Sequence, residues 1–281
     1  MKKIALFVLV LSAFLFESCT EKSVKEPKWK GATVTTTGEL APKVISQLTE
    51  DTKVIVTGEV KDDDSFFDEI SEGLRKLQVN NGTKLEPVYK PLMKVYLDLS
   101  KVTGITVIGK YSFTECSSLN GITLPSSVTE IGYEAFGLCT SLTNITIPNS
   151  VAKIEDCAFW KCTSLVSITI PSSVTIIGSK AFAECSSLLN ITIPSAVTSI
   201  EDYVVAGCFS LMSVTIPSTI TKIEKCSFLG CKSLKTINYR GTQEQWNTIK
   251  INWSGWEAGK YTPDGNDALK TATINYNYKG K

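Results

Sequence analysis

Hydrophobic and small residues recur with a fixed period between about residues 105 and 240. Six cysteines stand in phase, each 23 residues after the last, at Cys116, Cys139, Cys162, Cys185, Cys208 and Cys231. A leucine follows each cysteine by three positions, and a phenylalanine precedes five of the six by three, with Val205 in the remaining place. Because several independent columns keep one phase, the pattern predicts an array of structural repeats.

Each repeat contains a short segment in which apolar and polar residues alternate before a proline. In Asn144-Ile-Thr-Ile-Pro148 the alternation sends Ile145 and Ile147 into a core and Asn144 and Thr146 outward. The segment recurs at 122–125, 168–171, 191–194 and 214–217. One repeat cannot bury its own apolar face, but copies stacked at ~4.8 Å per strand turn each column into a buried ladder. The pattern predicts an α/β repeat solenoid with short parallel strands over residues 95–236.

The residues before the array predict an N-terminal cap over residues 34–94. The β-branched run Val54–Thr57 predicts a strand, and Val95–Leu99 predicts another. Between them, four apolar residues share one face of an expected helix: Phe66, Ile70, Leu74 and Leu77. Such a βαβ-like unit protects the first repeat, whose apolar side chains and strand edge are otherwise exposed.

The N-terminus has the pattern of an export signal. Lys2 and Lys3 precede the apolar run Ile4–Phe16, which is too short to span a bilayer, so residues 1–18 are expected to form a signal peptide. Ser18-Cys19 resembles a bacterial lipoprotein processing site, although Phe16 and Glu17 depart from its usual pattern. We expect lipidation at Cys19 and a charged tether over residues 19–33. The alternative is an ordinary cleaved signal.

The composition argues against several classes of function. The chain has 29 basic and 28 acidic residues, so its charge gives no reason to expect nucleic acid as a partner. It contains no histidine, which removes the commonest general base and the commonest neutral metal ligand. The sequence therefore predicts no catalytic residues, no metal site and no cofactor. A polysaccharide lyase or hydrolase built on a parallel β-helix is the enzyme alternative, but its acidic and basic residues are absent from the outward strand positions.

The six in-phase cysteines are interpreted as buried small hydrophobes. Parallel stacking separates their Cβ atoms by about 4.8 Å, whereas a disulfide needs about 3.8 Å. Metal sites gather their ligands within a turn or loop instead of taking one from each repeat. Disulfides and a metal site are therefore the disfavoured alternatives.

Residues 105–240 resemble the BspA-type leucine-rich repeats of bacterial surface proteins. The shared pattern is I-T-I-P-x-S-V-x-x-I-G-x-x-A-F-x-x-C-x-S-L, and Tyr239–Trp246 resembles the segment that often follows the last such repeat. Thr242 and Gln245 also have the spacing of a capping box, and Trp246 can cover the core, so 237–281 is expected to be a C-terminal cap. The resemblance implies a right-handed solenoid, display at the cell surface, and adhesion to host or neighbouring-cell macromolecules.

The outward strand positions are the candidate binding face. They carry hydroxyl and amide side chains without charge at Thr123, Asn144, Thr146, Ser167, Thr169, Asn190, Thr192, Ser213 and Thr215. Three apolar residues of successive repeats adjoin them at a position expected to be exposed: Val166, Leu189 and Met212. The alternative explanation of the uncharged face is a row of threonines favoured by their β-propensity. The alternative explanation of the three apolar residues is sequence drift among the repeats under weak selection. Trp160 is expected to be exposed on the opposite side.

Together these observations predict a monomeric surface protein that binds and does not catalyse. It is expected to be exported as an outer-membrane or cell-surface lipoprotein, or otherwise secreted, with membrane contact only through the lipid anchor. A protein partner is preferred to a glycan. The open alternatives are a structural envelope lipoprotein without an external ligand and a carbohydrate-binding module.

Overall fold

The computed structural model describes residues 32–37, 44–45, 48, 52–60, 63–79, 94–257, 260–262 and 265–280. The expected signal peptide (1–18), Cys19 and most of the expected tether lie outside these residues. The chain divides into residues 1–30 and 31–281, and all the described residues belong to the second part. Among the described residues, no helix has the length and hydropathy to span a bilayer.

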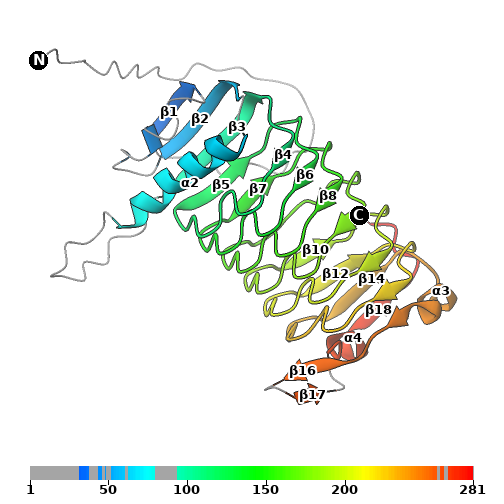
Figure 1. The fold of residues 1–281 in the computed structure, drawn as a ribbon. Helices are drawn as coiled ribbons and strands as arrows, with labels where there is room; N and C mark the ends of the chain where they lie inside the picture. Colours follow the sequence, from blue (N-terminus) through cyan, green and yellow to red (C-terminus); the bar gives the residue numbers. More distant parts are fainter. Residues whose placement is uncertain are drawn as a thin grey trace, which may run out of the picture. The chain divides into compact units, whose positions relative to one another are not determined.

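The first elements are three parallel strands and one helix. Strands β1 (Ala32–Thr37), β2 (Thr52–Glu59) and β3 (Val95–Thr103) pair in that order, and helix α2 (Asp63–Val79) lies between β2 and β3 in the chain (Figure 1). The four residues predicted to share a helix face are all buried. The expected strand–helix–strand order is confirmed, whereas β1 was not predicted.

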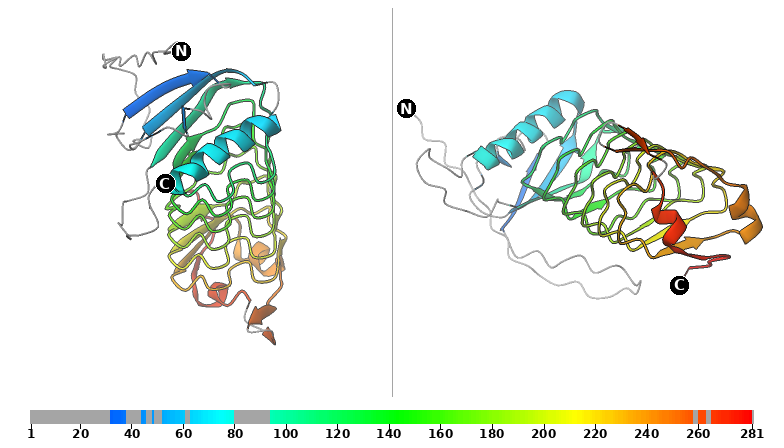
Figure 2. Two further views of the ribbon diagram at one scale, coloured as in Figure 1. Left: turned by 60° about the vertical axis from the view of Figure 1, so that its left-hand side comes forward. Right: turned by 90° about the horizontal axis from the view of Figure 1, so that it is seen from below.

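Two sets of short parallel strands follow. The first set contains β5 (Leu119–Thr123), β7 (Asn144–Thr146), β10 (Asn190–Thr192), β12 (Ser213–Ile216) and β14 (Thr236–Tyr239). The second contains β4 (Val107–Ile108), β6 (Glu130–Ile131), β8 (Lys153–Ile154), β9 (Ile176–Ile177), β11 (Ser199–Ile200), β13 (Lys222–Ile223) and β15 (Lys250–Ile251). Partners within the repeats lie one period apart, as Ile122 with Ile145. Figure 2 shows the successive turns of chain stacked side by side.

The first set of strands is interrupted in the middle of the array. β5 and β7 continue the N-terminal sheet, whereas β10, β12 and β14 belong to a separate sheet. The strand expected at 168–171 is therefore wrong, because residues 163–170 form no strand. Ile168 and Ile170 are only half-buried, although the equivalent Ile191 and Ile193 are buried. The second set is likewise split between β9 and β11.

The turns keep consecutive repeats in contact where the strands do not. In the first five turns the backbone N–H of the residue in the phenylalanine column donates to a carbonyl of the next repeat. These bonds run from Phe113 to Ala135, Phe136 to Ala158, Phe159 to Ala181, Phe182 to Val204 and Val205 to Ser227. The rings of Phe113, Phe136, Phe159 and Phe182 also stack, with centroids 5.2, 5.3 and 5.4 Å apart. The hydrogen bonds and stacked rings of the turns therefore keep consecutive repeats in register where the strands are interrupted.

The cysteine thiols contribute hydrogen bonds to the same turns. Cys139 Sγ donates to the Phe113 carbonyl at 3.0 Å, and Cys162 Sγ donates to the Phe136 carbonyl at 3.1 Å. The thiols of Cys185, Cys208 and Cys231 repeat this contact at 3.2 Å. Each accepting carbonyl also receives the amide of the cysteine in its own repeat. The buried cysteines were correctly predicted, but their role as donors was not.

Every turn contains two residues in the left-handed region, four positions apart. At the first position φ lies between 51° and 64° in Tyr111, Glu134, Cys157, Lys180, Tyr203 and Cys226. At the second, Glu115, Leu138, Lys161 and Glu184 have φ of 58–63°, and the last two repeats have Gly207 and Gly230 at 72°. Non-glycine residues in this region cost roughly 1–2 kcal/mol each, so the inter-repeat hydrogen bonds must hold these turns in place.

The last elements pack onto the end of the array. Helix α3 (Gln243–Thr248) begins with the predicted capping box, in which Thr242 and Gln245 bond reciprocally. Trp246 is buried, and its ring lies 5.1 Å from that of Tyr239. A hairpin of β16 (Gly255–Glu257) and β17 (Lys260–Thr262) follows, and then helix α4 (Ala268–Thr271). β18 (Thr273–Asn275) then pairs in parallel with β14.

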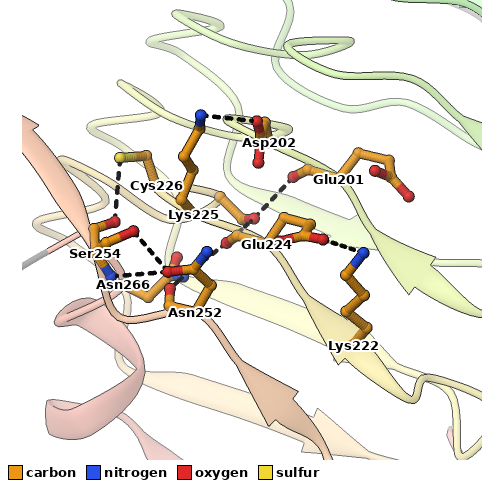
Figure 3. Close-up of polar contacts among 10 residues, drawn as sticks. Glu201, Asp202, Lys222, Glu224, Lys225, Cys226, Asn252, Ser254 and Asn266 are labelled. Atoms are coloured by element: carbon orange, nitrogen blue, oxygen red, sulfur yellow. Dashed lines mark hydrogen bonds and ion pairs between the residues drawn. The ribbon is translucent and has the colours of Figure 1, made fainter.

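A buried asparagine joins these elements to the last repeat. Asn266 Nδ2 donates to the carbonyls of Glu224 and Asn252 (Figure 3). Its Oδ1 accepts the amide of Phe228. The thiol of Cys226 donates to the Ser254 carbonyl in the same region. These bonds satisfy backbone groups that the next repeat would otherwise have paired.

We predict that Phe159→Ala lowers the free energy of unfolding by about 3–5 kcal/mol, because the ring is fully buried and stacks on both sides. Urea denaturation of the two proteins measures the difference. Phe209→Ala is the matched control, since Phe209 is 52% exposed. A loss below about 1 kcal/mol at Phe159 would show that the column does not support the fold.

Candidate functional site

Most residues of the stripe predicted as a binding face are accessible to solvent, and one is not. Thr146, Ser167, Thr169, Asn190 and Thr192 are exposed. Asn144 and Ser213 are half-buried. Thr215, which was expected to face outward into solvent, is only 9% exposed because Thr192 and Asn238 flank it on paired strands. The uncharged stripe is thus most accessible over residues 146–192.

The apolar column beside this stripe is smaller than expected. Val166 and Met212 are 44% and 46% exposed, but Leu189 between them is half-buried. Their backbones are directly bonded, since the Leu189 amide donates to Val166 and the Met212 amide donates to Leu189. The patch therefore consists of two exposed side chains joined by a partly covered third. We define Val166, Leu189 and Met212 as the apolar patch.

A groove of about 630 Å³ lies on the turn side and was not predicted. Four lining residues have no side chain beyond Cβ, namely Ala183, Ala206, Gly207 and Gly230, and we call them the floor of the groove. The remaining lining residues are Tyr133, Glu134, Cys157, Trp160, Lys180, Glu184, Tyr203, Phe209 and Leu229. Two sequence signals could have revealed it. Small Ala183 and Ala206 separate Trp160 from Leu229 in one column, and Phe209 stands in a column otherwise held by Ser, Thr and Lys.

Trp160 is held in a fixed orientation at the edge of this groove. It is half-buried, not fully exposed as expected. Its indole N–H donates to Glu184 Oε1 at 3.1 Å, and Lys161 Nζ lies 4.5 Å from the ring centroid. Glu184 also pairs with Lys161 at 3.7 Å. The three residues thus fix the ring before any ligand arrives.

The cysteines offer little for catalysis or metal binding. All eight described cysteines are free. Burial raises the pKa of Cys116 and of Cys208 to about 12, and it holds the pKa of Cys139, Cys162 and Cys185 well above the usual range. Thiols are nucleophiles and metal ligands only as thiolates, which burial disfavours here. Among the described residues, no cluster of Cys, Asp and Glu could hold a metal ion.

Cys157 differs from the six in-phase cysteines because it is half-buried and lines the groove. Burial raises the pKa of its thiol, Lys180 opposes that shift, and Glu134 reinforces it. Glu134, Cys157 and Lys180 all line the groove.

The stacked parallel strands and in-phase turns define a repeat solenoid protein of the leucine-rich repeat class. The chain belongs to the BspA type leucine rich repeat family, whose model matches six copies over residues 103–249. The predicted resemblance is confirmed. No curated protein matches the chain.

Several solved structures of bacterial leucine-rich repeat proteins are similar. A T. pallidum leucine-rich repeat protein is 31% identical, over 52% of this chain and 73% of that one, with a TM-score of 0.46. A leucine-rich repeat protein from Bacteroides ovatus is 30% identical, over 52% of this chain and 39% of that one, with a TM-score of 0.48. A leucine-rich cell surface protein from Faecalibacterium prausnitzii is 18% identical, over 81% and 88% of the chains, with a TM-score of 0.24.

The raised thiol pKa values predict a loss of stability at alkaline pH. A buried thiol keeps its proton above pH 9.0, whereas the unfolded chain loses it, so the native state binds more protons and unfolding becomes easier as pH rises. The contribution is complete below pH 9.0 and is lost up to about pH 12. Across this window Cys208 should lower the free energy of unfolding by about 1.4 kcal/mol per pH unit.

Urea denaturation at several pH values above 9.0 tests this prediction. Cys208→Ala should make the decline less steep, whereas Ser210→Ala, which removes no titrating group, should leave the slope unchanged. An identical slope in wild type and Cys208→Ala would contradict the burial of a protonated thiol at this position.

Proposed function

We propose that this protein is a non-catalytic recognition module that binds a protein of a host or neighbouring cell through the strand face. The observation that carries the proposal is the uncharged stripe of Thr146, Ser167, Thr169, Asn190 and Thr192 beside the exposed side chains of Val166 and Met212. Hydroxyl and amide groups can pair with an extended partner, and apolar side chains supply the area that excludes water.

Part of the proposal concerns the architecture that presents this face. We take residues 95–236 as a right-handed coil of 23-residue units, with caps at 34–94 and 237–281. The buried face of α2 and the first thiol support the N-terminal cap, because Cys116 Sγ lies 3.8 Å from the Ser71 carbonyl of that helix. Trp246, Leu269 and Asn266, which are all buried after the last repeat, support the C-terminal cap.

Display outside the cell is the remaining part of the proposal. It rests on the signal-like residues 1–18, on Cys19 as a lipidation site and on the charged residues 19–33 as a tether. Membership of the BspA type family is consistent with surface display. A lipid anchor would hold the module at the membrane and leave the strand face free for a partner.

We predict that the full-length chain binds at least one protein on an array of extracellular-matrix and cell-surface proteins. Met212→Asp should weaken this binding at least about tenfold, because a carboxylate would lose its water at an apolar contact. Surface plasmon resonance on the selected protein measures the effect, and Val166→Asp should act in the same direction.

The matched control is Ile176→Asp, which introduces the same charge at an exposed isoleucine of the other strand set. It should bind as wild type. Unchanged binding of both Met212→Asp and Val166→Asp would remove the apolar patch from the binding surface. Failure to bind any protein on the array would contradict the proposed function.

A further inference from the structure

The groove on the turn side is a consequence of two small side chains in one column. Trp160, Ala183, Ala206 and Leu229 stand in successive repeats, so the tryptophan and the leucine are about 14 Å apart along the stack. Because Ala183 and Ala206 have short side chains, the space above the backbone between Trp160 and Leu229 is open. The space between Trp160 and Leu229 is wide enough for more than one saccharide or peptide unit.

Aromatic faces are available on both sides of this space. One face of Trp160 is occupied by Lys161, and Lys180 Nζ lies 5.5 Å from the Tyr203 ring centroid. The second face of Trp160 and the exposed ring of Phe209 remain for a ligand, and both residues line the groove. Since Glu184 already orients the indole, stacking on Trp160 costs little side-chain entropy.

Two charged groups in the groove have no ion-pair partner among the described residues. Glu134 and Lys180 stand two repeats apart in one column, about 10 Å from each other, whereas the nearby Glu184 is paired with Lys161. Their charges cancel, so the groove does not select for a charged ligand. It offers a carboxylate that accepts hydrogen bonds and an ammonium group that donates them.

The two alanines of the floor offer no free backbone groups to a ligand. The amides of Ala183 and Ala206 donate to the Lys180 and Tyr203 carbonyls, and their own carbonyls accept the amides of Lys161 and Glu184. A peptide bound over these alanines would find no complementary backbone and would leave its own amides unpaired there. A suitable ligand therefore carries its polar groups at its edge and an apolar C–H surface on its face.

We infer that the groove is a binding site for a neutral oligosaccharide. The C–H faces of successive sugar rings lie against Trp160 and Phe209, while hydroxyls of the oligosaccharide donate to Glu134 and accept from Lys180. This site lies on the turns, so it is separate from the strand face proposed to bind protein and can operate without it.

The test uses the full-length chain and a panel of neutral hexasaccharides of glucose, mannose, xylose and N-acetylglucosamine, with binding measured by isothermal titration calorimetry. At least one hexasaccharide should bind saturably. Trp160→Ala should weaken that binding at least about tenfold, and Lys180→Met should weaken it severalfold. The matched control is Trp253→Ala, a partly exposed tryptophan outside the groove that also has a lysine, Lys270, over its ring.

Two further variants keep the outcome interpretable. Ala206→Phe fills the floor and should abolish binding while the thermal unfolding temperature shows that the protein is folded. Met212→Asp, on the strand face, should bind the hexasaccharide as wild type. Binding by none of the hexasaccharides, wild-type affinity in Trp160→Ala, or selection of peptides by the groove in a peptide array would each overturn the inference. None of these results bears on protein binding by the strand face.

Discussion

The fold depends on a backbone carbonyl that two repeats share. In the first five turns the carbonyl of the phenylalanine column accepts the amide of the cysteine three residues later and the thiol of the cysteine one repeat further on. Both lone pairs of a buried acceptor are then satisfied. A shift of register by one residue would move the thiol away from the carbonyl, which would lose one of its two hydrogen bonds. It would also separate the stacked phenylalanine rings. The column spacing is therefore a requirement for burying the turn.

This constraint explains why the two sides of the array differ. The turn side is bonded at every repeat, whereas the first strand set is interrupted at residues 163–170. Because the turns already hold the register, side chains that project from either side can vary without loss of the fold. The strand face carries an uncharged stripe with Val166 and Met212. The turn face carries the groove, which Ala183 and Ala206 open and Trp160 borders. One scaffold thus presents two surfaces of different chemistry.

The repeated columns, the burial of the cysteines, the helix with Phe66 and Ile70, and the capping box at Thr242 could be predicted because each depends on local periodicity. The strand break at Ile168, the burial of Thr215 and the groove could not. They depend on how side chains of neighbouring repeats pack against one another. A prediction from the repeat period assigns the same structure to every repeat and therefore misses such differences. The informative positions were the departures from the columns: Phe209 among serines and threonines, and small residues beside Trp160. The thiol bonds were missed because cysteine at a buried position is usually a small hydrophobe.

The most direct test of this account is the S–H stretching band in the Raman spectrum. A hydrogen-bonded thiol has a lower S–H stretching frequency than a free thiol, and five of the in-phase cysteine thiols donate to carbonyls at 3.0–3.2 Å. The native protein should show a band shifted to lower frequency that moves to the free-thiol position in denaturant, with its intensity reduced in Cys162→Ala. A native band that already stands at the free-thiol position would contradict the shared carbonyl and the register that it fixes.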